Sequence, residues 1–222
     1  MKISPTLTEV KEIAKTGKYD ILPVSCEILS DFITPIEAMR ILQNVSTHCY
    51  LLESAQANEA WGRYTFLGYD PKLEINCIDG HMKLGKLSVE TENPSEYIRQ
   101  ILSEYKSPKF DYLPSFTGGL VGYFSYDYLG YKEKSIRGKA KDTEDFKDVD
   151  LMLFDKVIAF DNLCQKIILI ANMSLDAPET GYNKAIVELK QLMELLMHGE
   201  KKQNMGGRLL GEVTPLFDKE QY

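Results

Sequence analysis

The spacing of hydrophobic positions alternates along the chain between the 3.6-residue repeat of helices and the two-residue repeat of strands. Helical spacing predicts helices over residues 6–17, 35–44, 94–105 and 180–197. Short runs rich in β-branched and aromatic residues predict strands over 20–30, 48–53, 63–69, 72–77, 81–84, 155–161 and 165–172. Helices and strands do not alternate strictly, so we expect an α+β fold with a mostly antiparallel, orthogonal β-sheet and flanking helices.

Local signals mark where some of these elements begin and turn. Thr34 and Pro35 predict a helix start, because threonine caps free amides and proline fits the first helical position. Asp79 and Gly80 predict a two-residue hairpin turn. The C-terminal helix carries a stripe of apolar residues at helical spacing, which predicts one buried face. These residues are Tyr182, Ala185, Ile186, Leu189, Met193 and Leu196.

Composition changes in two places. Residues 130–149 are rich in Lys, Asp and Glu with few apolar anchors, which predicts a solvated loop. Residues 199–222 are mostly polar and rich in glycine, as is typical of a linker. We therefore expect a domain over 1–198 and a linker over 199–222 that leads to a further domain.

Charge and cysteine content narrow the class of protein. The chain has 26 Lys and Arg against 33 Asp and Glu, a net charge of −7, which disfavours a nucleic-acid or anionic-membrane surface. It contains no signal-peptide core and no apolar run of about 18 residues, so we expect no membrane span. Its four cysteines include no closely spaced pair, which predicts reduced thiols in a cytoplasmic protein and no structural metal.

A glycine-rich segment is the first candidate for chemistry. Residues 116–127 contain Gly-Gly-Leu-Val-Gly, which could cradle a phosphate if a strand preceded it and a helix followed it. Residues 123–126 instead alternate as a strand does. We therefore interpret the segment as a glycine-kinked strand where another backbone comes close.

The second candidate is the predicted strand end at residues 51–55, Leu-Leu-Glu-Ser-Ala. Glu53 can pair with a ligand ammonium, and Ser54 can donate and accept hydrogen bonds. Arg63, in the following Trp-Gly-Arg-Tyr, could grip a carboxylate at two points. The alternative is a solvated strand end followed by a packed aromatic turn with an exposed arginine. The sequence holds neither a Ser-His-Asp array nor a tightly spaced carboxylate pair, so it predicts a binding surface without catalytic or metal-binding residues.

Together these segments resemble anthranilate synthase component I, the large subunit of the first committed enzyme of tryptophan biosynthesis. The stretches that carry the resemblance are residues 51–55, 61–68, 116–123, 126–127, 148–161 and 215–222. Their order and spacing match the family over essentially the whole chain. The resemblance implies an incomplete, N-terminal half of the anthranilate/aminodeoxychorismate synthase fold, with the family's chorismate-binding half beyond it.

The resemblance also implies the chemistry of the family. The family enzyme is a lyase that adds ammonia to chorismate and eliminates pyruvate to give anthranilate. Its C-terminal half holds the acid and base residues and the Mg²⁺-binding carboxylates, so we expect the present fragment to be inactive alone and to bind no cofactor. A glutamine amidotransferase subunit, component II, supplies the ammonia. A homo-oligomer is left open.

What the resemblance assigns to this chain is a feedback site. Glu53 and Ser54 match residues that contact the inhibitor L-tryptophan, with Glu53 meeting the α-ammonium and Ser54 the polar end of the amino acid. Arg63 matches a further basic contact less closely, because loop lengths vary there. Two alternatives stay open, namely the N-terminal part of aminodeoxychorismate synthase component I and a stand-alone amino-acid-binding module.

Overall fold

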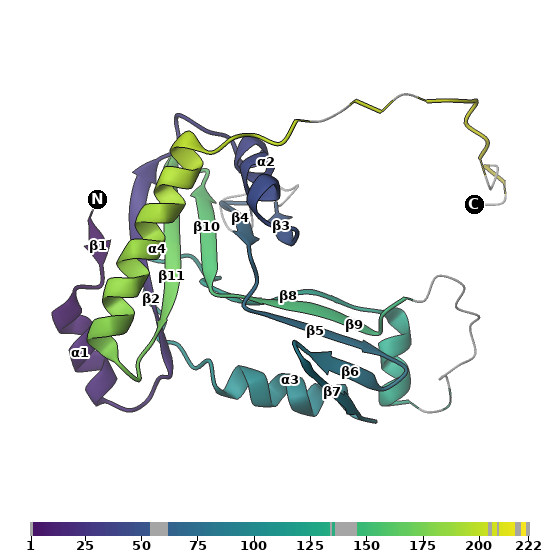
Figure 1. The fold of residues 1–222 in the computed structure, drawn as a ribbon, viewed down its shortest axis with the longest axis horizontal. Helices are drawn as coiled ribbons and strands as arrows, with labels where there is room; N and C mark the ends of the chain where they lie inside the picture. The colour runs from purple at the N-terminus through teal and green to yellow at the C-terminus, as the bar shows by residue number, and fades with distance from the viewer. Residues whose placement is uncertain are drawn as a thin grey trace.

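The computed structural model describes most of the chain. The described residues are 2–53, 62–133, 135, 146–203, 206–207, 209–215 and 219–220. They form an elongated molecule with one β-sheet toward each end (Figure 1). Within this part of the chain, no helix is long and apolar enough to cross a membrane.

The strands form two antiparallel sheets. The first sheet has the order β1 (Ile3–Ser4), β2 (Ile21–Leu29), β11 (Lys166–Ser174), β10 (Lys156–Asp161), β4 (Tyr64–Tyr69) and β3 (Cys49–Leu52). The second has the order β7 (Leu87–Glu90), β6 (His81–Leu84), β5 (Leu73–Ile78), β9 (Val149–Phe154) and β8 (Gly119–Phe124). In Figure 1, β2, β10 and β11 stand upright whereas β5, β8 and β9 run across the page. The predicted α+β class with antiparallel strands is confirmed.

Four α-helices and one 3₁₀-helix accompany the sheets in the described residues. They are α1 (Leu7–Lys15), α2 (Pro35–Val45), α3 (Pro94–Ser103), α4 (Pro178–His198) and the 3₁₀-helix η1 (Tyr126–Tyr131). The four predicted helices are confirmed. Thr6 and Thr34 each accept a hydrogen bond from the amide of a glutamate three residues on, and that glutamate accepts one from the threonine amide. These reciprocal capping boxes fix where α1 and α2 begin.

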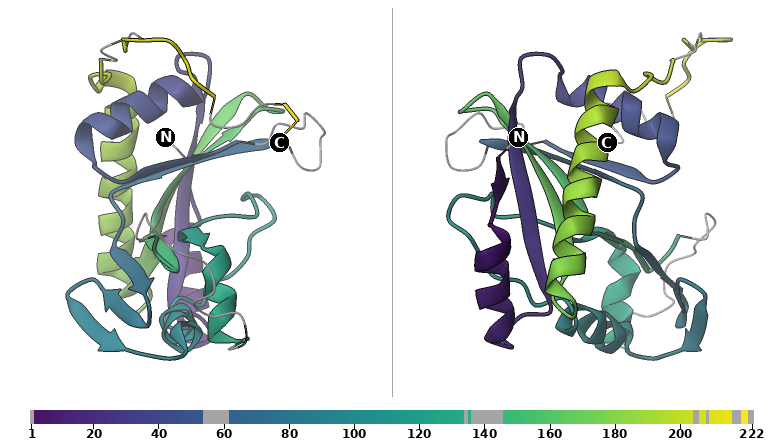
Figure 2. Two further views of the ribbon diagram at one scale, coloured as in Figure 1. Left: turned by 90° about the vertical axis from the view of Figure 1, so that its right-hand side faces the viewer. Right: turned by 60° about the vertical axis from the view of Figure 1, so that its left-hand side comes forward.

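The helices α1, α2 and α4 cover one face of the first sheet (Figure 2). The buried residues of α4 are Tyr182, Ala185, Leu189, Leu192 and Leu196, in alternating steps of three and four residues. This spacing keeps the buried residues on a single line that faces the sheet. Leu192, 1 % exposed, is therefore part of the core, whereas the predicted Met193 lies at its border.

The connection between α3 and β8 covers the opposite face of the first sheet. Leu113 and Phe116 of this connection pack against a row of buried strand residues, Val157, Ala159, Ile168 and Ile170. Both faces of β10 and β11 are thus covered, which explains why these strands are almost entirely apolar.

The second sheet has its own core. The helices α3 and η1 pack against one of its faces, around the buried residues Ile75, Cys77, Met82, Ile98, Val149 and Leu151. The strand β7 was not predicted from the sequence, and β9 was expected only as part of the region 148–161, without a boundary of its own. The hairpin of β5 and β6 was predicted, and Gly80 in its turn has the expected positive φ of 84°.

Two chain crossings join the sheets. The strand β4 leads into β5 through residues 70–72, and β9 leads into β10 through Asp155 alone. Lys156 Nζ lies 2.9 Å from Asp70 Oδ2. The amide of Lys72 donates a hydrogen bond of 2.8 Å to the carbonyl of Leu153. The two crossings therefore lie side by side.

Candidate functional site at the ends of β3 and β4

The predicted binding residues lie where β3 ends and β4 begins. Leu52, the last residue of β3, pairs with Phe66 of β4. Glu53 follows directly and is exposed, and Arg63 directly precedes β4. Because neighbouring antiparallel strands run in opposite directions, the structure brings Glu53 and Arg63 to the same end of the sheet. Ser54 lies outside the described residues.

Contacts of the Tyr50 ring anchor β3, which is the edge strand beside β4. The ring of Tyr50 lies over Gly68 of β4, where a Cβ atom would come within 2.2 Å of it. Tyr50 also meets Phe154 edge to face, with ring centroids 4.7 Å apart. Burial raises the pKa of Tyr50 well above its ordinary value. The strand that presents Glu53 is thus anchored at Tyr50, three residues before that carboxylate.

Arg63 binds an internal carboxylate. Its Nε and Nη2 donate hydrogen bonds of 3.1 and 2.7 Å to the two carboxylate oxygens of Asp161, at the end of β10. The Asp161 side chain is fully buried, whereas that of Arg63 is 35 % exposed. The amides of Leu163 and Cys164 also donate to Asp161. The bidentate grip expected of Arg63 therefore exists, but its partner is a residue of the same sheet.

The Arg63–Asp161 pair is held in its charged form. Burial alone would raise the pKa of the Asp161 carboxyl, but hydrogen bonds from Arg63 and from the Cys164 amide bring it below its ordinary value. The hydrogen bond to Asp161 raises the pKa of Arg63. Because this pair joins β4 to β10, it stabilises the strand end beside Glu53.

Replacing Arg63 with methionine should lower the free energy of unfolding by about 2–4 kcal/mol at neutral pH, because Asp161 would stay buried without its partner. A carboxyl whose pKa is lowered in the folded state stabilises the protein above its unfolded pKa, about 3.9, and this stabilisation is lost as the pH falls through the folded pKa. The stability lost in the variant should therefore become smaller as the pH falls toward 3. Urea unfolding of both proteins at pH 7 and at pH 3 measures this difference.

A matched control is Lys11→Met, which removes the exposed ion pair with Glu179 at 2.9 Å. Exposed pairs contribute about 0–1 kcal/mol, so this variant should unfold nearly as the unmodified chain does. If both variants lost the same stability, or if the effect of Arg63→Met did not depend on pH, the Arg63–Asp161 pair would contribute no more to stability than an exposed ion pair.

The glycine-rich segment forms β8, and its interpretation as a glycine-kinked strand is confirmed. Gly118, Gly119 and Gly122 have φ values of 141°, 140° and 151°. A Cβ atom at Gly122 would lie 1.9 Å from the carbonyl oxygen of Asp150 on the neighbouring strand. The close backbone approach that the sequence predicted is therefore found at Gly122.

The comparisons with known proteins complete this description. The family model described as chorismate binding enzyme matches residues 47–222, so this chain belongs to the chorismate binding enzyme family. Anthranilate synthase component 1 of Acetivibrio thermocellus is 33% identical over 85% of this chain and 38% of its own length. That of Pseudomonas aeruginosa is 36% identical over 85% of this chain and 39% of its own length.

A solved structure agrees with these relatives. Anthranilate synthase component I from Streptococcus pneumoniae TIGR4 has a TM-score of 0.53 and 26% sequence identity, over 78% of this chain and 37% of that one. The chain thus resembles anthranilate synthase component 1 over most of its length, as the sequence predicted. It spans about two fifths of the length of the curated relatives described above.

Proposed function

We propose that this chain is the N-terminal, tryptophan-sensing portion of an anthranilate synthase component I. The observation that carries the proposal is the exposed carboxylate of Glu53 at the end of β3, inside a stretch that resembles the family's feedback site. The relatives named anthranilate synthase component 1 support the assignment to this branch of the family.

The chemistry of the strand end suits an amino acid with a large apolar side chain. The carboxylate of Glu53 can pair with an α-ammonium, and the hydroxyl of Ser54 can bond the other polar atoms. Leu52, which directly precedes Glu53, is 49% exposed and offers apolar surface to an indole ring. The guanidinium of Arg63 is bound to Asp161. Arg63 therefore supports this site by holding the start of β4 in place, and we do not assign it a contact with the ligand.

The reaction itself belongs to the remainder of such an enzyme. In this proposal a chorismate-binding half converts chorismate and ammonia to anthranilate and pyruvate, and a glutamine amidotransferase subunit supplies the ammonia. The described residues include no cluster of three or more His, Cys, Asp or Glu side chains that could hold a metal ion. The proposal places the Mg²⁺ of the reaction in the chorismate-binding half, as the family resemblance implies.

Incubation of this chain alone with chorismate, Mg²⁺ and ammonia should give no anthranilate fluorescence above a heat-killed control, because general acid–base chemistry needs groups placed around the substrate. Fusion to the C-terminal portion of the Acetivibrio thermocellus relative should restore the reaction, and L-tryptophan should inhibit it. Anthranilate from the chain alone, or a restored reaction that tryptophan does not inhibit, would contradict the proposal. An aminodeoxychorismate product would place the chain in the sister branch.

A further inference from the structure

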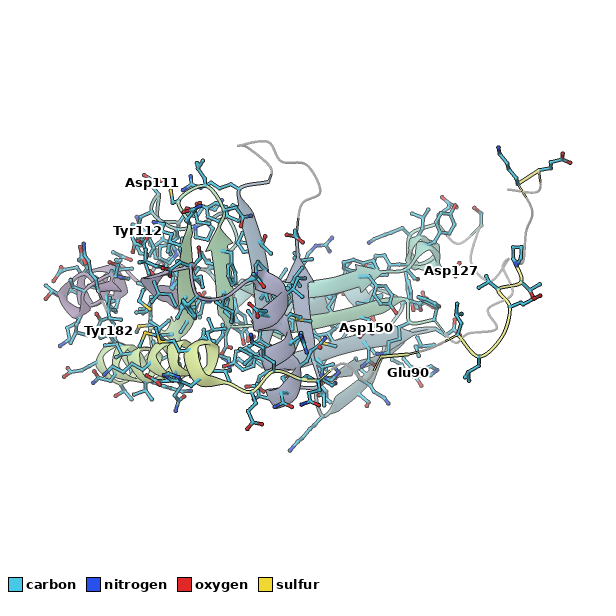
Figure 3. All side chains as sticks on the ribbon, turned by 90° about the horizontal axis from the view of Figure 1, so that it is seen from above. Glu90, Asp111, Tyr112, Asp127, Asp150 and Tyr182 are labelled. Atoms are coloured by element: carbon cyan, nitrogen blue, oxygen red, sulfur yellow. The ribbon has the colours of Figure 1, made fainter. Side chains whose placement is uncertain are left out.

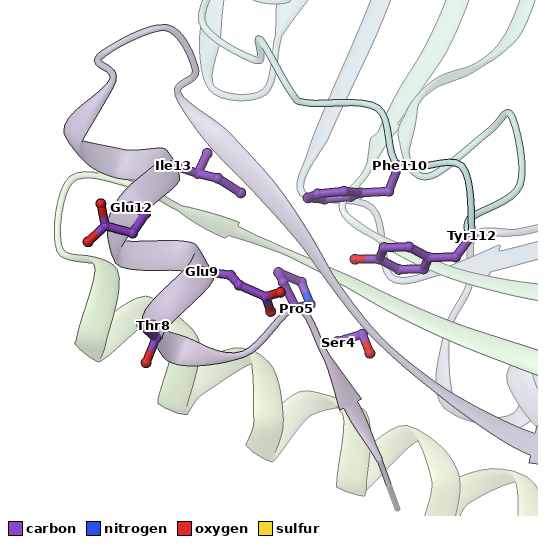
Figure 4. A pocket seen from close by; sticks show the side chains of 8 residues that line it. All are labelled: Ser4, Pro5, Thr8, Glu9, Glu12, Ile13, Phe110 and Tyr112. Carbon is purple, nitrogen blue, oxygen red and sulfur yellow. The ribbon is translucent and has the colours of Figure 1, made fainter.

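A second candidate site lies at the opposite edge of the first sheet, beside β1. A cavity of about 440 Å³ opens between α1, the Ser4-Pro5 segment and the connection that carries Phe110 and Tyr112 (Figure 4). None of its lining residues belongs to β3 or β4. Seen from above, Tyr112 and Tyr182 lie at the opposite end of the molecule from Glu90 and Asp127 (Figure 3). The volume is within the usual range for small-molecule sites.

The charged side chains that line this cavity are both carboxylates, Glu9 and Glu12. Glu12 pairs with Lys15 at 2.6 Å. Glu9 Oε2 accepts hydrogen bonds of 2.7 and 2.8 Å from the amide and hydroxyl of Thr6, which fix its orientation. Within the described part of the chain, Glu9 has no basic partner. The cavity therefore holds a preorganised carboxylate whose charge no cation of the described residues neutralises.

Two aromatic rings form the facing wall. Phe110 and Tyr112 stack with centroids 5.1 Å apart and an angle of 24° between their planes. The Tyr112 hydroxyl points toward the side of the cavity that Glu9 occupies (Figure 4). Burial and the charge of Glu9 raise the pKa of Tyr112 to about 12, so the phenol remains a hydrogen-bond donor. Tyr112 is 46% exposed, which leaves ring surface for a ligand.

We propose that this cavity binds a small primary ammonium ion with an aromatic or alkyl body. The ammonium would meet Glu9, and the body would lie against Phe110, Tyr112 and Ile13. Aromatic faces attract cations, and a carboxylate that is already oriented loses little freedom on binding. An anionic ligand is disfavoured, because the lining includes no basic side chain. Lys2 lines an adjoining cavity, which shares Ser4 and Tyr112 with this one.

The test is isothermal titration of the full chain with phenethylammonium chloride and, separately, with 3-phenylpropionate, which has the same body and the opposite charge. We expect saturable binding of the ammonium and none of the carboxylate. Glu9→Gln should weaken binding about fivefold, on the scale of an exposed ion pair. Glutamine also serves in a capping box, so α1 should keep its start. Phe110→Leu should weaken binding about threefold.

Glu37→Gln is the matched control, because Glu37 fills the same capping-box position in α2 and does not line the cavity. Its affinity for phenethylammonium should equal that of the unmodified chain, and circular dichroism should show that all variants fold. The proposal is overturned if phenethylammonium does not bind saturably, if Glu9→Gln binds it equally well, or if 3-phenylpropionate binds as tightly.

Discussion

Replacing Glu53 with alanine, in an enzyme that joins this chain to a chorismate-binding half, should weaken inhibition by L-tryptophan by about thirtyfold or more while turnover stays nearly unchanged. Tryptophan is a zwitterion with a large indole, and indole burial over about 150–250 Å² could supply roughly 4–6 kcal/mol without orienting the polar groups. A buried ammonium that loses its carboxylate partner costs about 2–5 kcal/mol. Inhibition curves beside uninhibited rates measure the effect.

Ser54→Ala should weaken inhibition less, because a neutral hydrogen bond contributes about 0.5–1.5 kcal/mol. The control is Glu90→Ala, an exposed glutamate at the end of β7 in the second sheet (Figure 3). It should leave both inhibition and turnover unchanged. Unchanged tryptophan sensitivity in the Glu53 and Ser54 variants would remove both residues from the feedback site.

The second prediction with a large effect concerns the stability of the second sheet. Gly122→Ala should lower the free energy of unfolding by about 2–6 kcal/mol, the sum of a backbone strain of about 1–3 kcal/mol and a comparable cost of overpacking. The strain arises because φ is 151° at this position. The overpacking arises because the new Cβ atom would meet the Asp150 carbonyl oxygen at 1.9 Å, so β8 and β9 would have to separate.

Gly119→Ala separates the two contributions. Gly119 has a similar φ of 140°, but the nearest atom to its Cβ position is 3.7 Å away. This variant should therefore lose only the strain, about 1–3 kcal/mol. Urea unfolding of both variants measures the difference, and equal losses would show that the close approach of β8 to β9 costs nothing.

The sequence predicted those elements whose signals are local. Thr34 and Pro35 mark the start of α2, and Asp79-Gly80 marks the turn between β5 and β6. Within residues 148–161, β9 was not separated from β10, because only one residue lies between them and no turn signal marks it. The strand β7 was missed because it has no buried residue, and only Val89 of its four residues is even partly buried, so its sequence lacks an apolar face.

The candidate site was predictable only in part. The position of Glu53 at a strand end followed from the pattern of residues 51–55, and its role toward tryptophan remains a prediction. The partner of Arg63 could not be found in this way, because Asp161 is 98 residues away in the sequence. Only the pairing of β4 with β10 brings the two together.

That pairing has a consequence for how the chain folds. The strands β4 and β10 form a hairpin whose loop contains the whole second sheet. Closing so long a loop costs conformational entropy before any contact between β4 and β10 forms to offset that cost. Once the second sheet has formed, it holds Asp70 close to Lys156. The two ends of the loop are then near each other, so pairing β4 with β10 costs much less conformational entropy. We therefore expect the inserted sheet to assemble early, and the centre of the first sheet to close only after β10 and β11 have left the ribosome.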